Sequence, residues 1–285
     1  MAAEVEQSAD QSSRKQAFML WYRNYDNPAI RSLVGLALAK TSEYGDYRLV
    51  RSRELTQGRA LYELANDKSG LIDIINVATS PAREQRLNAI PVPIDGGLLG
   101  FRVCVTVPEK LPLFEGVRTL DDLVERGISI GQGSHWPDTP ILKANGVSVV
   151  THSHYEILFG MLRNNRFDCF ARGVSEVLHD LEVEGDPGLV IEPNLVIAYP
   201  MPSYLFVGPE KDLLAYRLQL GLERAIEDGT FAEYLRHYFS RPVMSLNLED
   251  RHIIRLENPY LTEESRHLGR NTLRNLQQRV KLFAD

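Results

Sequence analysis

Apolar and polar residues follow one another along the first 80 positions in a pattern that predicts three strands and two helices. Strand-like runs occupy residues 17–22, 47–51 and 71–77, and the last is apolar throughout, as buried parallel strands usually are. Residues 28–39 and 57–66 carry apolar side chains three and four positions apart, which is the spacing of one helix face. The order strand-helix-strand-helix-strand predicts one doubly wound α/β half.

A second alternation of strands and helices follows. Its clearest helix ends near Asn164 and Asn165, because asparagine tolerates the left-handed conformation that closes many helices. A short apolar strand over 167–171 comes next, Gly173 breaks it, and helical spacing resumes over 174–181. The other strands predicted here are residues 96–107, 128–130, 147–150 and 190–191.

Two long strand-like runs flank this middle block and define the predicted domain organisation. Residues 101–108 leave the first half and residues 195–209 return to it, so we expect two doubly wound α/β lobes joined by two crossover strands, with a ligand cleft between them. Helices are expected over 213–227, 231–239 and 271–282. The predicted divisions are a disordered tail over 1–16, a first lobe from 17–102 and 204–285 that includes a C-terminal extension, and a second lobe from 103–203.

Composition narrows the function classes. The 285 residues carry a formal net charge of −6 and no run of lysine and arginine, which argues against nucleic-acid binding. No apolar run approaches the ~20 residues of a membrane span. Cys104 and Cys169 lie in apolar strand-like runs, and we interpret them as two buried thiols, with a disulfide as the alternative. Cysteine usage therefore leaves the compartment open.

Four short motifs carry a resemblance to a known family. They are Ser-Pro-Ala-Arg at 80–83, Gly-Gln-Gly-Ser at 131–134, Arg-Phe-Asp at 166–168 and Ala-Ile-Glu-Asp-Gly-Thr at 225–230. In this order the chain resembles the type 2 periplasmic solute-binding proteins from about residue 18 to about residue 238, in particular the amino-acid-binding family 3. Through residues 134–139, 166–176 and 257–261 it is also similar to an uncharacterised, transporter substrate-binding-like subgroup of bacterial proteins.

The resemblance implies where a ligand carboxylate would bind. The family places an arginine at the position of Arg83 to hold that group, with Ser80 standing here in place of threonine. A guanidinium can hold a carboxylate in a two-pronged fork. The glycine-bearing turn of the second lobe would add backbone N–H groups and a hydroxyl, from Ser134 and His135, although Ser134 is equally suited to cap the next helix.

The second lobe departs from the family at Arg172. This arginine lies at the carboxyl end of a predicted strand, where α/β folds bind ligands, and where the family has an acid for the ligand's ammonium group. Glu176, one helical turn on, is a possible substitute or an ordinary solvated residue. We therefore expect Arg83 and Arg172 to face each other across the cleft and to select an anionic, carboxylate-bearing ligand.

Aromatic residues complete the expected ligand set. Trp21 and Tyr22 follow the first strand, and Trp136 lies in the loop of the second lobe. One ring from each lobe would sandwich an apolar or planar ligand body, while plain core packing is the alternative for each. Tyr199 and Tyr204 are interpreted as packing residues beside the hinge.

The resemblance implies a solute-binding protein without cofactor or metal. It would act as a monomer in the periplasm after removal of a signal peptide, and deliver its small-molecule ligand to an ABC-type membrane permease. An enzyme like cyclohexadienyl dehydratase is the second hypothesis, with His135 and Asp138, or Glu176, as acid and base. A stand-alone sensory domain is the third. His152 and His154 are two apart, but two ligands without a third do not make a metal site.

Overall fold

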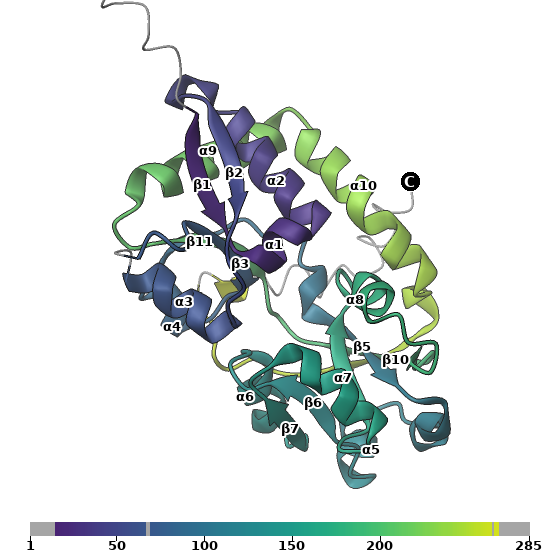
Figure 1. The fold of residues 1–285 in the computed structure, drawn as a ribbon. Coiled ribbons are helices and arrows are strands. Elements are labelled where there is room, and N and C mark those ends of the chain that lie inside the picture. The colour runs from purple at the N-terminus through teal and green to yellow at the C-terminus, as the bar shows by residue number, and fades with distance from the viewer. Residues whose placement is uncertain (1–14, 67–68, 264, 268–285) are drawn as a thin grey trace, which may run out of the picture.

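The computed structural model describes residues 15–66, 69–263 and 265–267, which form two α/β lobes (Figure 1). Almost all of the predicted N-terminal tail, and the helix predicted over 271–282, lie outside the described residues. No helix in the described part of the chain combines the length and apolarity needed to cross a membrane.

The first lobe is built on a five-stranded sheet with the order β2-β1-β3-β11-β4. β1, β2 and β3 are parallel, and β11 runs antiparallel to β3 and to β4. The strands are β1 (Gln16–Leu20), β2 (Tyr47–Arg51), β3 (Ile74–Ala78), β4 (Asn88–Ile90) and β11 (Ser203–Val207).

Alternate residues of these strands face two helix layers. On β11, Leu205 and Val207 pack with α2 (Pro28–Ala39) and α9 (Asp212–Glu227), whereas Tyr204 and Phe206 pack with α3 (Gln57–Asn66) on the other face. This is the period of two expected of a strand buried on both sides. The helices predicted over 28–39 and 57–66 are confirmed, and α2 begins at the expected Asn27-Pro28 pair, where Asn27 Oδ1 accepts from the N–H groups of Ala29 and Ile30.

The chain departs from the predicted first strand at its end. β1 stops at Leu20, and the short helix α1 (Tyr22–Asp26) begins where the strand was expected to continue. Trp21 and Tyr22 therefore stand at the carboxyl end of a parallel strand, which is the edge that faces the second lobe.

The second lobe contains a seven-stranded sheet with the order β12-β10-β5-β8-β6-β7, and β9 pairs with β5. Its strands are β5 (Phe101–Thr106), β6 (Ile130–Gly133), β7 (Val149–His152), β8 (Cys169–Gly173), β9 (Val190–Ile191), β10 (Leu195–Ala198) and β12 (His252–Arg255). Its helices are α5 (Leu120–Glu125), α6 (Asp138–Ala144), α7 (Tyr155–Arg163) and α8 (Val177–Glu184).

Three glycines expected in turns lie within strands. Gly131 and Gly133 belong to β6, where the rings of Phe167 and Trp136 lie so close that a Cβ atom would collide with them. Gly173, expected to break its strand, is the last residue of β8 and pairs with Arg102 of β5. From the sequence alone, glycine is expected to end a strand. In the structure these glycines lie within the sheet, because neighbouring side chains leave no room for a Cβ atom.

The two predicted connections between the lobes exist, but their bounds differ. β5 lies wholly in the second sheet, so the first connection is the preceding segment 91–100. The long run over 195–207 is divided at residues 199–202 into β10 of the second sheet and β11 of the first. Pro200 and Pro202 fall in the break, as expected since proline cannot donate to a sheet. The connections touch where Tyr199 N–H donates to the Gly100 carbonyl at 3.0 Å.

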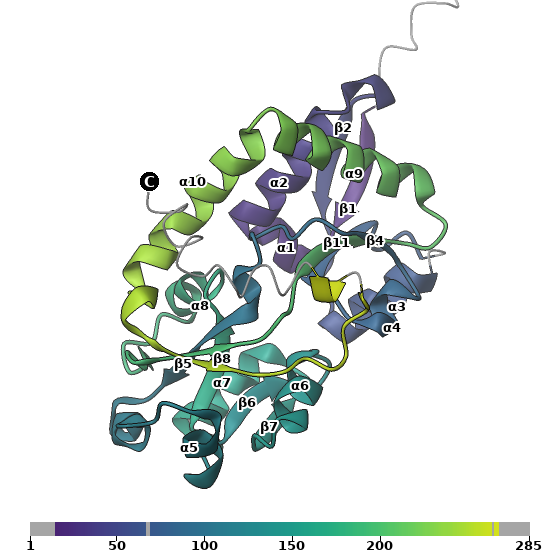
Figure 2. The same cartoon turned by 180° about the vertical axis from the view of Figure 1, so that it is seen from behind.

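The chain visits the second lobe again after α10 (Thr230–Ser245). β12 pairs in parallel with β10, which differs from our assignment of residues 204–285 to the first lobe. The segment after β12 then returns to the first lobe, where Ser265 Oγ donates to Glu84 at 2.8 Å (Figure 2). β12 could pair there because β10 would otherwise be the edge strand of the second sheet. The local sequence pattern does not show which distant strand has an unpaired edge.

The interpretation of the cysteines as free thiols is wrong. Cys104 of β5 and Cys169 of β8 form a disulfide, with Cα atoms 5.0 Å apart. β5 and β8 are antiparallel neighbours in which Cys104 lies opposite Ala171, so Cys169, two residues from Ala171, shares its face of the sheet.

Candidate functional site

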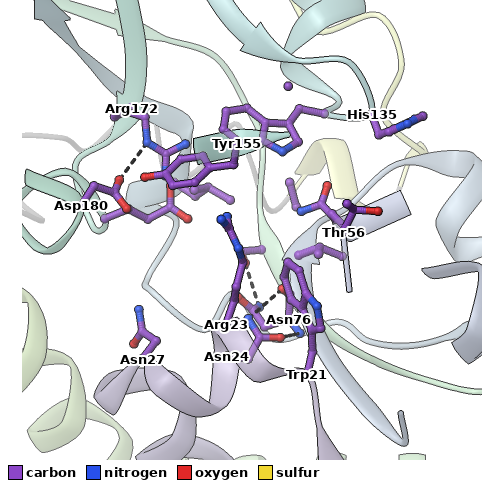
Figure 3. A pocket seen from close by; sticks show the side chains of 18 of the residues that line it. Trp21, Arg23, Asn24, Asn27, Thr56, Asn76, His135, Tyr155, Arg172 and Asp180 are labelled. Atoms are coloured by element: carbon purple, nitrogen blue, oxygen red, sulfur yellow. Dashed lines mark hydrogen bonds and ion pairs between the residues drawn. The ribbon is translucent and has the colours of Figure 1, made fainter. Parts of the chain in front are cut away.

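A cavity of about 420 Å³ lies between the two lobes. The first lobe contributes Trp21 and Arg23, and the second contributes Tyr155 and Arg172, among others (Figure 3). Arg83 of the first lobe also lines the cavity. The carboxyl ends of β1 and β3 on one side, and of β7 and β8 on the other, place these side chains at the cleft.

Arg83 is a buried cation at this cavity. It lies on the short helix α4 (Pro81–Glu84), and its guanidinium donates to the carbonyl of Ala78, to Gln57 Oε1 at 3.2 Å and to the carbonyl of His135 in the other lobe at 3.0 Å. Among the described residues, no carboxylate lies within ion-pair distance of it. Burial lowers the pKa of Arg83 to about 10, although Asp138 acts against that. The site thus holds a guanidinium that no carboxylate of the described chain neutralises.

Ser80, Ser134 and His135, which were predicted to bind the ligand together with Arg83, do not all line this cavity. Ser134 and His135 line this cavity, whereas Ser80 lines a neighbouring one. The backbone N–H of Ser134 donates to the carbonyl of His152 at 3.0 Å, and Pro137 rather than Ser134 occupies the cap position of α6. His135 presents its carbonyl, not an N–H group, to Arg83.

Arg172 faces the cavity but is not a free cation. Its Nε donates to Asp180 at 2.8 Å and its Nη2 to Glu176 at 3.1 Å. Burial acts to lower the pKa of Arg172, but the two carboxylates outweigh it and raise that pKa above its usual range. The guanidinium also lies over the ring of Trp136, 4.9 Å from its centroid. The inference from Arg172 to an anionic ligand is therefore wrong, because α8 supplies carboxylates that the strand pattern does not show.

A second buried ion pair escaped the sequence analysis. Arg102 of β5 lies 2.8 Å from Asp138, whose Oδ1 also accepts from the hydroxyl of Tyr199 at 2.6 Å. The sequence did contain a sign of this pair, because Arg102 is a charged residue within the apolar run Phe-Arg-Val-Cys-Val-Thr-Val. A charged residue that is buried is almost always paired. Together with Arg172, Glu176 and Asp180, this wall of the cavity holds two guanidinium groups and three carboxylates, a formal balance of one negative charge.

Aromatic rings from both lobes line the cavity, as predicted. Trp21 is buried and its Nε1 donates to the carbonyl of Leu55 at 3.0 Å, while Tyr22 lies edge-on to it. Trp136 stacks on Phe170 with an interplanar angle of 10°. The sequence analysis missed Tyr155, whose ring lies 5.0 Å from the Arg172 guanidinium.

Arg23 joins the lobes across the cleft. It belongs to α1, forms an ion pair with Glu156 of α7, and lies 4.2 Å from the centroid of the Tyr155 ring (Figure 3). Asn24 holds α1 in place, since its Oδ1 accepts from Asn76 N–H of β3 at 2.7 Å. The lobes are thus in direct contact, through Arg23 as well as through Arg83.

His152 and His154 bond to each other rather than to a third ligand. The N–H of His154 donates to His152 Nδ1 at 3.0 Å. Within the described ranges there is no group of three histidine, cysteine, aspartate or glutamate side chains that could hold a metal ion.

Comparison with known proteins identifies the fold. No protein-family model and no curated protein matches the chain, but solved structures do. An ancestral arginine-binding protein bound to arginine is 15% identical, with a TM-score of 0.57 over 79% of this chain and 99% of that one. An amino acid ABC transporter substrate-binding protein of Streptococcus pneumoniae bound to L-arginine is 16% identical, with a TM-score of 0.55 over 80% and 95%. An ancestral amino-acid-binding precursor of cyclohexadienyl dehydratase is 12% identical, with a TM-score of 0.54 over 79% and 96%.

These similarities confirm the predicted fold, which is the type 2 periplasmic binding fold. They cover most of the chain at low identity, so they establish the architecture of two lobes around a cleft and no more.

Proposed function

We propose that this protein captures a small zwitterionic solute, an amino acid or a compound that carries the same two charged groups, in the cleft between its lobes and delivers it to an ABC-type transporter. The observation that carries the proposal is Arg83, a buried guanidinium at the cavity with no carboxylate partner among the described residues. A buried charge is costly unless it is paired, and a ligand carboxylate would supply the pair.

The opposite wall supports a positive group on the same ligand. Its formal balance is one negative charge, which matches one ammonium. Glu176 is the most accessible of its three carboxylates, because 39% of its side chain is exposed, against 4% for Asp138 and 14% for Asp180. We therefore assign the ligand's ammonium to Glu176 and its carboxylate to Arg83. The solved structures with this fold that hold arginine also support an amino acid rather than an anion.

The disulfide supports a location outside the cytosol. Disulfides persist in oxidising compartments such as the bacterial periplasm and are rare in the cytosol. Cys104 and Cys169 are paired, and the structures with this fold include substrate-binding proteins of ABC transporters. Both observations support the proposal of a periplasmic or extracellular protein that serves a membrane permease.

The test is calorimetric titration with the common L-amino acids, followed by variants of the residue that carries the proposal. Arg83→Gln should weaken binding of the best ligand by about 30-fold or more, because breaking a buried charged contact costs about 2–5 kcal/mol. Arg48→Gln is the matched control, since it removes the same charge from an exposed side chain of β2 that lines neither this cavity nor its neighbour. Equal binding by the Arg83 variant and its parent would remove the basis of the proposal.

One observation favours a dehydratase as the second candidate. Loss of solvation in the cleft between the lobes raises the pKa of Glu176, although its side chain stays partly exposed, and a raised pKa suits a group that gives or takes a proton. A solved structure with this fold is an ancestral precursor of such an enzyme. Against this, Asp138 bonds to Tyr199 and Arg102, so it is not positioned to orient His135. Incubation with prephenate and arogenate separates the two functions, because repeated turnover lost in Glu176→Gln would favour the enzyme.

A further inference from the structure

We infer that the ligand is longer than a free amino acid, and that a second cavity beside the first takes an uncharged aromatic or apolar group of it. This inference rests on the proposed function for the charged end of the ligand. The second cavity has a volume of about 500 Å³ and lies between α3 and α4 of the first lobe and α6 of the second.

The chemistry of the second cavity differs from that of the first. Leu61, Leu87, Pro140 and Ile141 make much of its wall apolar, and none of the described residues that line it is acidic. Its charged side chains are Arg83 and Arg86, so a cationic group would be repelled there. An uncharged group that buries apolar surface is the occupant that this lining favours.

The two cavities adjoin each other at Arg83 and His135. Both residues line both cavities, as does Trp136. The partition consists of the hydrogen bond from Arg83 to the His135 carbonyl, 3.0 Å long, and of the His135 imidazole lying against Gly58. A ligand carboxylate that replaces the carbonyl as the partner of Arg83 would open this partition. One ligand could then extend from the first cavity into the second.

The C-terminal extension builds one wall of the second cavity. Asn258 and Tyr260 line it, and this segment lies beyond the part of the sequence that resembles family 3. Asn145 holds the extension by two hydrogen bonds to the backbone of Glu257, at 2.8 and 3.0 Å. Asn258 Nδ2 donates to the carbonyl of Pro200 at 2.7 Å, and its Oδ1 accepts from Tyr260 N–H at 3.0 Å. The extension is thus fixed both to the second lobe and to the connection between the lobes.

Two tyrosines stand at this cavity with exposed rings. Tyr62 of α3 is 54% exposed and Tyr260 of the extension is 46% exposed, and both line the cavity. Burying exposed aromatic rings against an apolar group of a ligand is energetically favourable. The ligand class that follows is a zwitterionic head joined to an aromatic or apolar substituent, such as a dipeptide with an aromatic residue.

The experiment is calorimetry on the full chain with three kinds of probe: free amino acids, L-alanyl-L-alanine and L-alanyl-L-phenylalanine. The aromatic dipeptide should bind about tenfold or more tightly than L-alanyl-L-alanine, the gain expected from burying an aromatic ring. Ala65→Trp, which fills the second cavity from α3, should abolish that gain and leave any binding of free L-alanine within about twofold. Ala232→Trp, at an exposed helical position of α10, is the matched control and should keep the gain.

Tyr260→Ala provides a second variant if Ala65→Trp fails to fold, and it should reduce the same gain. No advantage of the aromatic dipeptide in the parent protein, or an advantage that persists in both variants, would overturn the inference. Binding of free amino acids that depends on Arg83 would then still support the proposed function. If neither amino acids nor dipeptides bind, the proposed function fails and the inference falls with it.

Discussion

Asp168 links three segments of the second lobe through its carboxylate. Oδ2 accepts from the N–H of Ser129 at 2.9 Å and from its hydroxyl at 2.7 Å, and Oδ1 accepts from Lys110 at 2.8 Å. Burial acts to raise the pKa of Asp168, but the hydrogen bonds from Lys110 and Ser129 outweigh it and lower that pKa below its usual range. This residue of the Arg-Phe-Asp motif therefore braces the start of β8, the strand that carries Arg172.

The lowered pKa of Asp168 predicts how the stability of the protein changes at acid pH. A carboxyl with a lower pKa in the folded state contributes stability above its unfolded pKa, about 3.9, and loses it as the pH falls below that value. Asp168→Asn should therefore be less stable than the parent at pH 7, by about 1–3 kcal/mol, and the difference should shrink as the pH falls below about 4. Urea unfolding at several pH values measures this. Asp46→Asn, at an exposed position, should show little difference at any pH, and a pH-independent deficit in Asp168→Asn would contradict the assignment.

At the scale of elements, β5 organises the second lobe. It pairs with β8, β9 and β10, and it carries both Arg102 of the cavity wall and Cys104 of the disulfide. The disulfide to Cys169 closes a loop of 65 residues that contains β6 and β7. It therefore restrains the unfolded chain over much of this lobe.

Removal of the disulfide should cost stability without removing the site. Cys104→Ala/Cys169→Ala should lower the free energy of unfolding by about 2–5 kcal/mol, the usual cost of losing a native disulfide. A reducing agent should lower the urea midpoint of the parent and leave that of the double variant unchanged. Equal midpoints for the oxidised parent and the double variant would show that the disulfide contributes nothing to stability.

At the scale of the whole molecule, contacts across the cleft hold the two lobes together. Arg23 pairs with Glu156 and lies over Tyr155, and Arg83 reaches the carbonyl of His135. The segment after β12 adds a further link, since it is bonded to Asn145 of the second lobe and to Glu84 of the first. Closure in such folds is a hinge motion, and its balance depends on a few contacts of this kind.

Loss of the Arg23 contacts should shift the ligand-free protein towards an open form. Arg23→Ala should increase the radius of gyration in X-ray scattering, and a bound ligand should restore the smaller value. The shift should be modest, about fivefold in the closed-to-open ratio, because a partly exposed ion pair and a cation–π contact contribute about 1 kcal/mol. Arg31→Ala is the control, because Arg31 lies over Tyr25 within the first lobe. An unchanged radius in Arg23→Ala would mean that these contacts do not hold the lobes closed.

The sequence by itself determined most of the local elements and the order of the lobes. Periodicity and capping are local properties, so β2 and α3 match their predicted bounds and α2 begins at the predicted Asn27-Pro28 pair. The positions of Arg83, His135 and Trp136 at the cleft followed from short motifs placed after strands. These features depend on residues within a few positions of one another.

Only the tertiary structure decided what those residues do. Asp180 and Glu176 neutralise Arg172, Asp138 pairs with Arg102, and Cys104 joins Cys169. β12 pairs in the second sheet, and the extension behind it builds a cavity wall. The argument from Arg172 to an anionic ligand failed for the same reason, because the charge of a site is the sum over side chains brought together from separate elements. Register and strand order set which of them meet, and neither can be read from local periodicity.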